Sequence, residues 1–198
     1  MTKTKSPLKD KPLRYAGQSL DEALDDLLTD KALIYYMAGC MCLMAAMYEW
    51  WRYYKPLEKP PIVTSVVCVS MAIFCVVKIV IHIRKMKSYK QGRDGERAVG
   101  QYLETFREMG CHVFHDILGE NFNVDHVVIS DKGIYVIETK TYSKPERGET
   151  VIDFDGRRVL INGRESKSNI VTQAKAASSY VKNIINDSTG KRFEVFPV

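Results

Sequence analysis

Two long apolar runs dominate the first half of the chain. Residues 32–51 contain a single charged side chain, Glu49, and residues 62–83 contain only Lys78. Each run is long enough to cross the hydrocarbon core of a bilayer as a helix, which needs roughly 20 apolar residues. Three prolines between the runs prevent one continuous helix. The pattern predicts a transmembrane helical hairpin over residues 32–83.

The second half of the chain alternates between β-branched runs and stretches of helical periodicity. Helices are predicted from about Asp94 to Met109, ended by Gly110, and from Ser168 to about Asn186. Strands are predicted from alternation and turn residues. They fall around Cys111–His115 and at 123–130, 133–140, 151–154, 159–161 and 193–198. This order of elements predicts an α/β domain over residues 92–198, with a central sheet flanked by helices.

Residues 1–31 divide into a lysine-rich tail and a short acidic amphipathic helix. Ser19 and Glu22 form a capping box, and one stripe holds the apolar side chains Leu20, Leu24, Leu27 and Leu28. Helices that lie on membrane surfaces usually carry lysine and arginine on the polar face. An acidic helix therefore favours a protein partner, which the sequence does not identify.

The distribution of charge predicts an orientation. The chain has a net charge of +5, yet residues 92–198 carry 15 basic and 16 acidic side chains. The excess lies in a basic juxtamembrane linker, residues 84–91, which has four basic side chains and no acid. Six lysines and arginines between Arg84 and Arg97 outnumber the three in the connecting loop, so both termini are expected to be cytoplasmic. The same basic residues suit anionic lipid.

The most informative chemistry lies in the first predicted hairpin. If its loop is Asp131-Lys132, then Asp125 lies directly opposite Glu138, with Cβ atoms about 5 Å apart. Lys140 shares a face with Glu138 because side chains two apart lie on the same side of a strand. A three-residue loop would shift the register by one and leave the two acids as diagonal neighbours. The shorter loop thus predicts two acids and a lysine in one place.

Apolar residues on both faces of the hairpin argue against a solvent-exposed strand. Val127, Ile129 and Val136 are expected on the face of the acids, and Val128 and Ile137 on the other. Carboxylates at the ends of such strands are costly to desolvate without a partner. Two close carboxylates suit Mg²⁺, which binds one or two acids and keeps several waters. We therefore favour a metal site over an ordinary half-exposed strand.

At these residues the chain resembles the nuclease-related domain (NERD) family, a branch of the PD-(D/E)xK nuclease superfamily. The resemblance covers residues 92–198 and is carried by four segments. They are Gly92-Arg-Asp-Gly95-Glu96, Asn123-Val-Asp125-His126-Val-Val-Ile, Gly133-Ile-Tyr-Val-Ile-Glu138-Thr-Lys140-Thr-Tyr142, and Gln173-Ala174. It implies a restriction-endonuclease-like mixed sheet flanked by helices, here preceded by the two-helix transmembrane hairpin.

The resemblance also implies roles for individual residues. Asp125 and Glu138 would bind Mg²⁺ or Mn²⁺, the Thr139 carbonyl would add a ligand, and Lys140 would orient water or stabilise phosphate charge. Glu96 would complete the acidic cluster, although an acid near a helix N-terminus is equally explained by the helix dipole. Gln173 would be an accessory site residue, and its alternative is an ordinary surface glutamine.

Three functions remain open at this point. The first is a membrane-anchored metal-dependent nuclease that hydrolyses phosphodiester bonds, with DNA the favoured substrate although no residue distinguishes it from RNA. The second is a non-catalytic adaptor that binds nucleic acid or protein through a nuclease-like fold. The third is a metal-binding sensor or structural tether. Clustered carboxylates, which repel phosphate, weigh against the adaptor.

Overall fold

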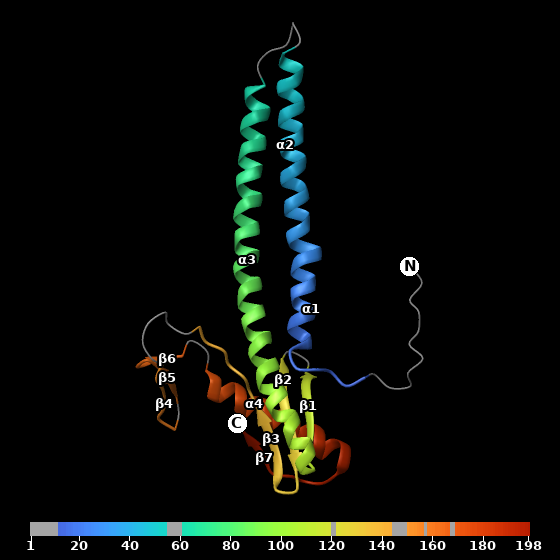
Figure 1. Cartoon of the computed structure of the whole chain (residues 1–198), viewed down its shortest axis with the longest axis vertical. Coiled ribbons are helices and arrows are strands. Elements are labelled where there is room, and N and C mark those ends of the chain that lie inside the picture. The colour runs from blue at the N-terminus through green and yellow to red at the C-terminus, as the bar shows by residue number, and fades with distance from the viewer. Residues whose placement is uncertain (1–11, 55–60, 120–121, 144–149, 157, 167–168) are drawn as a thin grey trace. The chain divides into compact units, whose positions relative to one another are not determined.

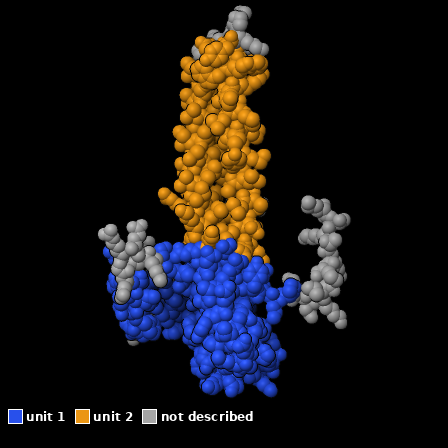
Figure 2. Space-filling view, in the orientation of Figure 1, with its two compact units in different colours: residues 1–19, 91–198 blue, residues 20–90 orange. Residues whose placement is uncertain are grey.

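A computed structural model describes residues 12–54, 61–119, 122–143, 150–156, 158–166 and 169–198. The chain forms two compact units, coloured separately in Figure 2. One contains residues 91–198 together with the N-terminal residues up to Ser19, and the other contains residues 20–90. The sequence pattern predicts a C-terminal domain that begins at residue 92, and no signal in the sequence indicates that an N-terminal segment belongs to it. The lysine-rich tail before residue 12 and the loop at 55–60 lie outside the described residues.

The helical unit is built from the apolar runs (Figure 1). Helix α1 (Gln18–Asp26) continues through the π-helical turn η1 (Leu27–Ala32) into α2 (Leu33–Tyr53), and α3 spans Ile62–Glu104. The described residues contain two helices that are long and apolar enough to cross a membrane, by length and composition alone. Side chains such as Met41 and Val63 are largely exposed. The leucine stripe of α1 is in part covered, because Leu24 and Leu27 are buried.

Helix α3 is longer than the sequence suggested. The expected linker at 84–91 and the expected helix from Asp94 are both part of one 43-residue helix, which ends in the 3-10 turn η2 (Thr105–Met109). No proline interrupts this stretch, and an interior glycine costs a helix only about 1 kcal/mol. Gly95 serves close packing, since a Cβ there would lie 2.0 Å from Cγ2 of Thr141. Gly110 ends η2 in the left-handed conformation, as predicted.

The C-terminal unit is built on a mixed four-stranded sheet in the order β1-β2-β3-β7. The first three strands are antiparallel, and β7 pairs parallel with β3. Their bounds are β1 His112–Leu118, β2 Asn123–Ser130, β3 Gly133–Ile137 and β7 Val195–Pro197. The α/β class and the mixed sheet are confirmed, and β7 is an edge strand of this sheet.

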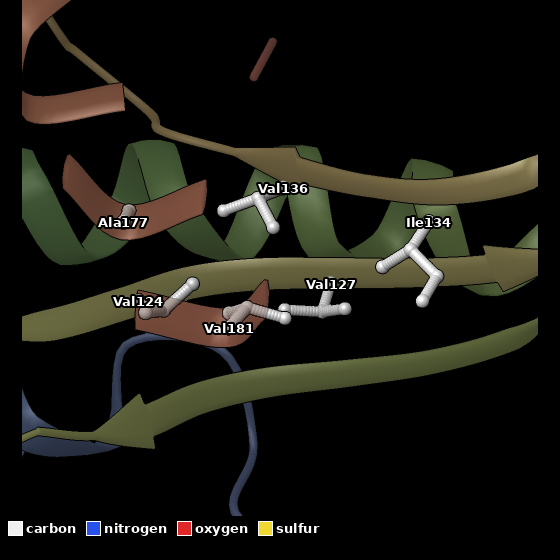
Figure 3. Close-up of a cluster of buried hydrophobic side chains, with 6 residues drawn as sticks. All are labelled: Val124, Val127, Ile134, Val136, Ala177 and Val181. Atoms are coloured by element: carbon white, nitrogen blue, oxygen red, sulfur yellow. The ribbon is translucent and has the colours of Figure 1, made fainter. Parts of the chain in front are cut away.

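Helix α4 (Ile170–Thr189) covers one face of the sheet. Ala177 and Val181 of α4 pack against valines of β2 and β3, as Figure 3 shows. The other face is covered by α3 and η2, where Leu103 packs with Val113 and Val128. Asn169 caps α4 by accepting a hydrogen bond from the Thr172 amide at 3.2 Å. Two-sided packing explains why the strands read as nearly continuous apolar runs.

A small second sheet follows the first. The expected hairpin forms from β4 (Ile152–Phe154) and β5 (Val159–Ile161), and a third strand, β6 (Arg164–Glu165), pairs with β5. Strand β6 was not predicted, although the Asn162-Gly163 turn, with φ of 50° and 72°, is the type of turn that joins such strands. Arg158 is exposed at the tip of the hairpin, and Arg157 lies outside the described residues.

Core packing predicts a contrast between two isoleucines. Ile134 is 5% exposed beneath α4, whereas Ile152 is 64% exposed on the small sheet. Ile134→Ala should lower the free energy of unfolding by about 2–5 kcal/mol, because it removes buried methyl groups and leaves a cavity. Ile152→Ala should change it by no more than about 0.5 kcal/mol. Denaturant unfolding of both variants measures the difference, and equal effects would contradict the placement of this core.

Candidate metal centre

The first hairpin has the register that the short loop predicted. Ser130 pairs with Gly133 across a two-residue turn, and the ladder continues to His126 opposite Ile137. Asp125 and Glu138 occupy the next position, directly beyond the last pair of the ladder. The alternative three-residue loop is thereby excluded, and the two acids lie side by side where β2 and β3 separate.

Both acids have hydrogen-bond partners from the segment that follows β3. Asp125 Oδ2 accepts the Thr139 backbone N–H at 2.7 Å, and Glu138 Oε1 accepts from Lys140 Nζ at 2.6 Å. The Glu138 amide donates to the Val198 carbonyl at 3.0 Å, so the residue directly after β7 supports the backbone at this position. The Glu138 side chain is 10% exposed and that of Lys140 is 32% exposed. The lysine can therefore contact solvent or a ligand while it remains paired.

Strand β2 does not alternate regularly at the site. Val124 and Val127 both pack in the cluster beneath α4 although they are three residues apart, whereas strict alternation would put them on opposite faces. His126 packs toward Gly100 of α3, and Asp125 interacts electrostatically with Glu96 of the same helix. Strict alternation, which would put Asp125 on the face of Val127, therefore does not hold at this end of β2. Asp125 lies at this interruption.

Burial and mutual repulsion raise the pKa of two carboxyls. Desolvation raises the pKa of Glu96 to about 8, and the charges of Asp125, Asp116 and Glu138 add to this effect while Lys140 opposes it. The pKa of Asp125 rises to about 7, mainly through desolvation and the charge of Glu138, against the Thr139 hydrogen bond and Lys140. Glu96 is thus part of the acidic cluster. The helix-dipole explanation of this residue no longer applies, because Glu96 lies in the interior of α3.

Asp116 is a fourth acid that the sequence analysis missed. Pairing of His115 with His126 and of Ile117 with Val124 places it across from Asp125. It is 1% exposed and has a positive φ of 50°, which is unusual for a residue other than glycine. Its signal in the sequence is a single acid in a short strand that also holds Val113, Phe114, Ile117 and Leu118.

The remaining predicted residues differ in their relation to the cluster. The Thr139 hydroxyl is buried without a hydrogen-bond partner, next to the backbone that contacts Asp125. Gln173 is exposed in the first turn of α4, and nothing in the described part of the chain connects its side chain to the acids. The structure therefore brings together Glu96, Asp125, Glu138 and Lys140, and leaves Gln173 apart.

Comparison with known proteins places this arrangement in a family. The family model described as "Nuclease-related domain" (NERD) matches residues 91–198, which is more than half of the chain. The chain belongs to the NERD family. An uncharacterized protein of Bacillus anthracis is 32% identical over 66 residues, which cover 31% of this chain and 29% of that protein. The chain thus aligns with less than a third of that relative's length. No solved structure matches the chain.

The donor set of this NERD domain fits a hard divalent cation. Within the described residues, no three His, Cys, Asp or Glu side chains are arranged to hold a metal ion as they stand. However, two carboxylates and a backbone carbonyl are the oxygen ligands that Mg²⁺ uses, with water completing the octahedron. Burial, and after it the charges of the neighbouring acids, raises the pKa of Glu96 and Asp125 and so disfavours their charged forms without a cation. A cation would relieve this repulsion.

His126 is a structural residue of the NERD domain. It is fully buried, and its Nδ1 lies 2.8 Å from Nδ1 of His115, whose Nε2 lies 2.7 Å from Glu104 Oε1. Desolvation, together with the charge of His115, lowers the pKa of His126 to about 4. The imidazole is therefore neutral at physiological pH. This environment gives His126 a role in packing within the domain.

Removing the charge at Glu96 should stabilise the metal-free protein. Its folded pKa of about 8 exceeds the ordinary 4.5, so the folded state binds the proton more tightly, and this stability is lost as pH rises through about 8. Glu96→Gln should raise the free energy of unfolding at pH 8 by about 1 kcal/mol after allowance for solvent screening, and should have little effect near pH 4.5.

Thermal denaturation of the full chain in chelator at the two pH values measures this effect. Glu108→Gln, at an exposed position in η2, is the matched control. A Glu96→Gln variant that is equally or less stable than the parent at pH 8 would show that the acidic cluster is not repulsive.

Proposed function

We propose that this protein is a membrane-anchored, metal-dependent nuclease that hydrolyses phosphodiester bonds of nucleic acid. The observation that supports this most strongly is the joint position of Asp125, Glu138 and Lys140 in the register that the nuclease motif requires. Glu96, from a different element, interacts with all three. Membership of the NERD family supports a nuclease-related function.

The proposed roles follow from each group's environment. Asp125, Glu138 and the Thr139 carbonyl would hold Mg²⁺ or Mn²⁺, with Glu96 as a further ligand or as a base for a bound water. A divalent cation at this position would lower the pKa of bound water and polarise a phosphoryl oxygen. Lys140 is partly exposed beside Glu138, so it can approach a phosphate and stabilise negative charge that develops during hydrolysis.

Nucleic acid, with DNA favoured, is the proposed substrate, and its binding depends on local chemistry. The 15 basic and 16 acidic residues of residues 92–198 provide no general attraction for a polyanion. The metal and Lys140 would therefore supply most of the positive charge that the scissile phosphate meets. This predicts that substrate binding is weak without a divalent cation.

Cleavage assays on the full chain in lipid nanodiscs test the proposal. With Mg²⁺ or Mn²⁺, the parent should cleave labelled DNA or RNA, and Glu138→Ala or Lys140→Ala should lower the rate at least about 100-fold, as loss of a catalytic charge does. Glu108→Ala and Lys132→Ala, both at exposed positions, are the charge-matched controls and should retain activity.

The outcome also distinguishes the alternatives. Activity that persists in Glu138→Ala would contradict the proposed site. A folded protein that binds nucleic acid without cleavage would favour the non-catalytic adaptor, and one that binds Mn²⁺ but no nucleic acid would favour a sensor or structural tether.

We further propose that α2 and the first half of α3 span a membrane. In the most apolar windows of the two candidate helices, 0% and 6% of residues are buried within the protein, whereas the core helix of a soluble domain would be largely covered. Residues 62–83 would extend about 33 Å at 1.5 Å per residue, close to the thickness of a bilayer core. Trp50 and Trp51 lie near one end of α2, as expected for interfacial anchors.

The basic residues after the second span would face the cytoplasm and its anionic lipids. Arg84, Lys85 and Lys87 are exposed on α3. Arg93 forms an ion pair with Asp94, and Arg97 lies over the Tyr15 ring at 5.7 Å. We therefore restrict the proposed lipid contact to residues 84–90, a narrower range than the Arg84 to Arg97 cluster suggested by sequence.

Reporter fusions test the proposed topology, with both termini cytoplasmic. In a bacterial host, green fluorescent protein fused after Val198 should fluoresce, and alkaline phosphatase fused there should be inactive. Alkaline phosphatase inserted in the loop at 55–60 should be active, because the lysine and arginine excess directs this loop to the opposite side. Phosphatase activity at the C-terminus would contradict the orientation.

A further inference from the structure

An N-terminal segment, residues 14–19, is bound to the buried Asp116. Arg14 Nε donates to Asp116 Oδ2 at 2.7 Å, and the Ser19 amide donates to the same oxygen at 2.8 Å. The Ser19 hydroxyl donates to Oδ1 at 2.6 Å. Asp116 thus accepts from the backbone amide of Ser19, in the first turn of α1. In the expected Ser19–Glu22 capping box, the Ser19 side chain was to accept such an amide. Both carboxylate oxygens are occupied by this one segment.

The same segment packs closely on α3 beside the turn that carries Glu96. A Cβ at Gly100 would lie 2.6 Å from the Ala16 Cβ, and a Cβ at Gly17 would lie 3.0 Å from Arg93 Cγ. Ala16 and Gly17 are buried. Such contacts are possible only because small residues let the two backbones approach. Arg93 and Gly100 bracket Glu96, so the segment contacts α3 on either side of it.

We propose that residues 14–19 are a strap that positions the metal centre. The strap holds the Glu96 turn of α3 against β1 and β2, and its two donor side chains, Arg14 and Ser19, keep Asp116 out of the metal's coordination sphere. The inference rests on the proposed function, because it assigns a role at the same site. Neither the family motif nor residues 92–198 contain this element.

The position of Asp116 shows why the strap matters. Asp116 lies across from Asp125, and its charge acts on both Glu96 and Asp125. Without Arg14 and Ser19, a buried carboxylate would lose its hydrogen bonds, which is strongly unfavourable. Asp116 would then be free to turn toward the cation and compete with the three acids. The strap therefore selects which carboxylates face the cation.

Moving a methyl group from position 16 to position 100 tests the strap, in the full chain in lipid nanodiscs. Gly100→Ala forces the strap away from α3, and Gly100→Ala combined with Ala16→Gly removes the clash. We expect Gly100→Ala to weaken Mn²⁺ binding about tenfold, as the loss of outer-shell support does, and the double variant to regain most of that affinity. Gly39→Ala, where a Cβ would be 3.7 Å from its nearest neighbour, is the matched control.

A second pair of variants does not depend on whether the fold tolerates a side chain at position 100. Arg14→Gln removes the ion pair to Asp116 and should also weaken Mn²⁺ binding, whereas Arg192→Gln, at an exposed position, should not. Mn²⁺ affinity is measured by electron paramagnetic resonance, and hydrogen exchange reports the backbone of residues 93–100. Exchange there should accelerate in Gly100→Ala and Arg14→Gln and return to the parent rate in the double variant.

The outcomes separate the strap from the nuclease proposal. Unchanged Mn²⁺ affinity and unchanged exchange in both Gly100→Ala and Arg14→Gln would overturn the strap, whatever the protein cleaves. A loss in Gly100→Ala that Ala16→Gly fails to restore would overturn it as well. Mn²⁺ binding with the predicted rescue but no cleavage would support the strap and overturn the nuclease. A parent protein that binds no Mn²⁺ would overturn both.

Discussion

Burial of like charge is the constraint on which this domain depends. Glu96 of α3, Asp125 of β2 and Glu138, directly after β3, act on one another electrostatically, and the charge of Asp116 acts on the first two. Desolvation and mutual repulsion each disfavour the charged state. A protein that places acids in this way needs a partner for them. In this domain Lys140 supplies part of that charge, and we propose that a divalent cation supplies the rest.

Several local features make this convergence possible. Hairpin β2–β3 sets Asp125 beside Glu138, at the point where β2 departs from strict alternation. Gly95 lets α3 approach the segment after β3, because any side chain there would clash with Thr141. The amide of Thr139 then holds Asp125 in place. At each of these positions the chain departs from regular strand alternation or lacks a side chain, and such departures are typical of functional positions.

Sequence patterns predicted contacts between residues that are close in the chain, and missed contacts between residues that are far apart in it. A two-residue turn and β-branched alternation were enough to predict the register that joins Asp125 and Glu138. Sequence spacing could not predict that the strap binds Asp116, because Arg14 and Ser19 lie about 100 positions away from it. It also could not show that α3 runs unbroken through Gly92 and Gly95, since glycine occurs both at helix ends and at sites of close packing.

The contacts of the strap with Asp116 affect how experiments on an isolated nuclease domain should be interpreted. A fragment that begins at residue 84 or 91 contains every residue of the family motif but lacks Arg14 and Ser19. Its Asp116 would be buried without the donors that satisfy both oxygens, and the face of α3 beside Glu96 would lose Ala16 and Gly17. Inactivity of such a fragment would therefore reflect a damaged site as readily as a missing function. A form of the protein that retains residues 12–19 keeps the donors of Asp116, so it is the form in which to test the chemistry of the acidic cluster.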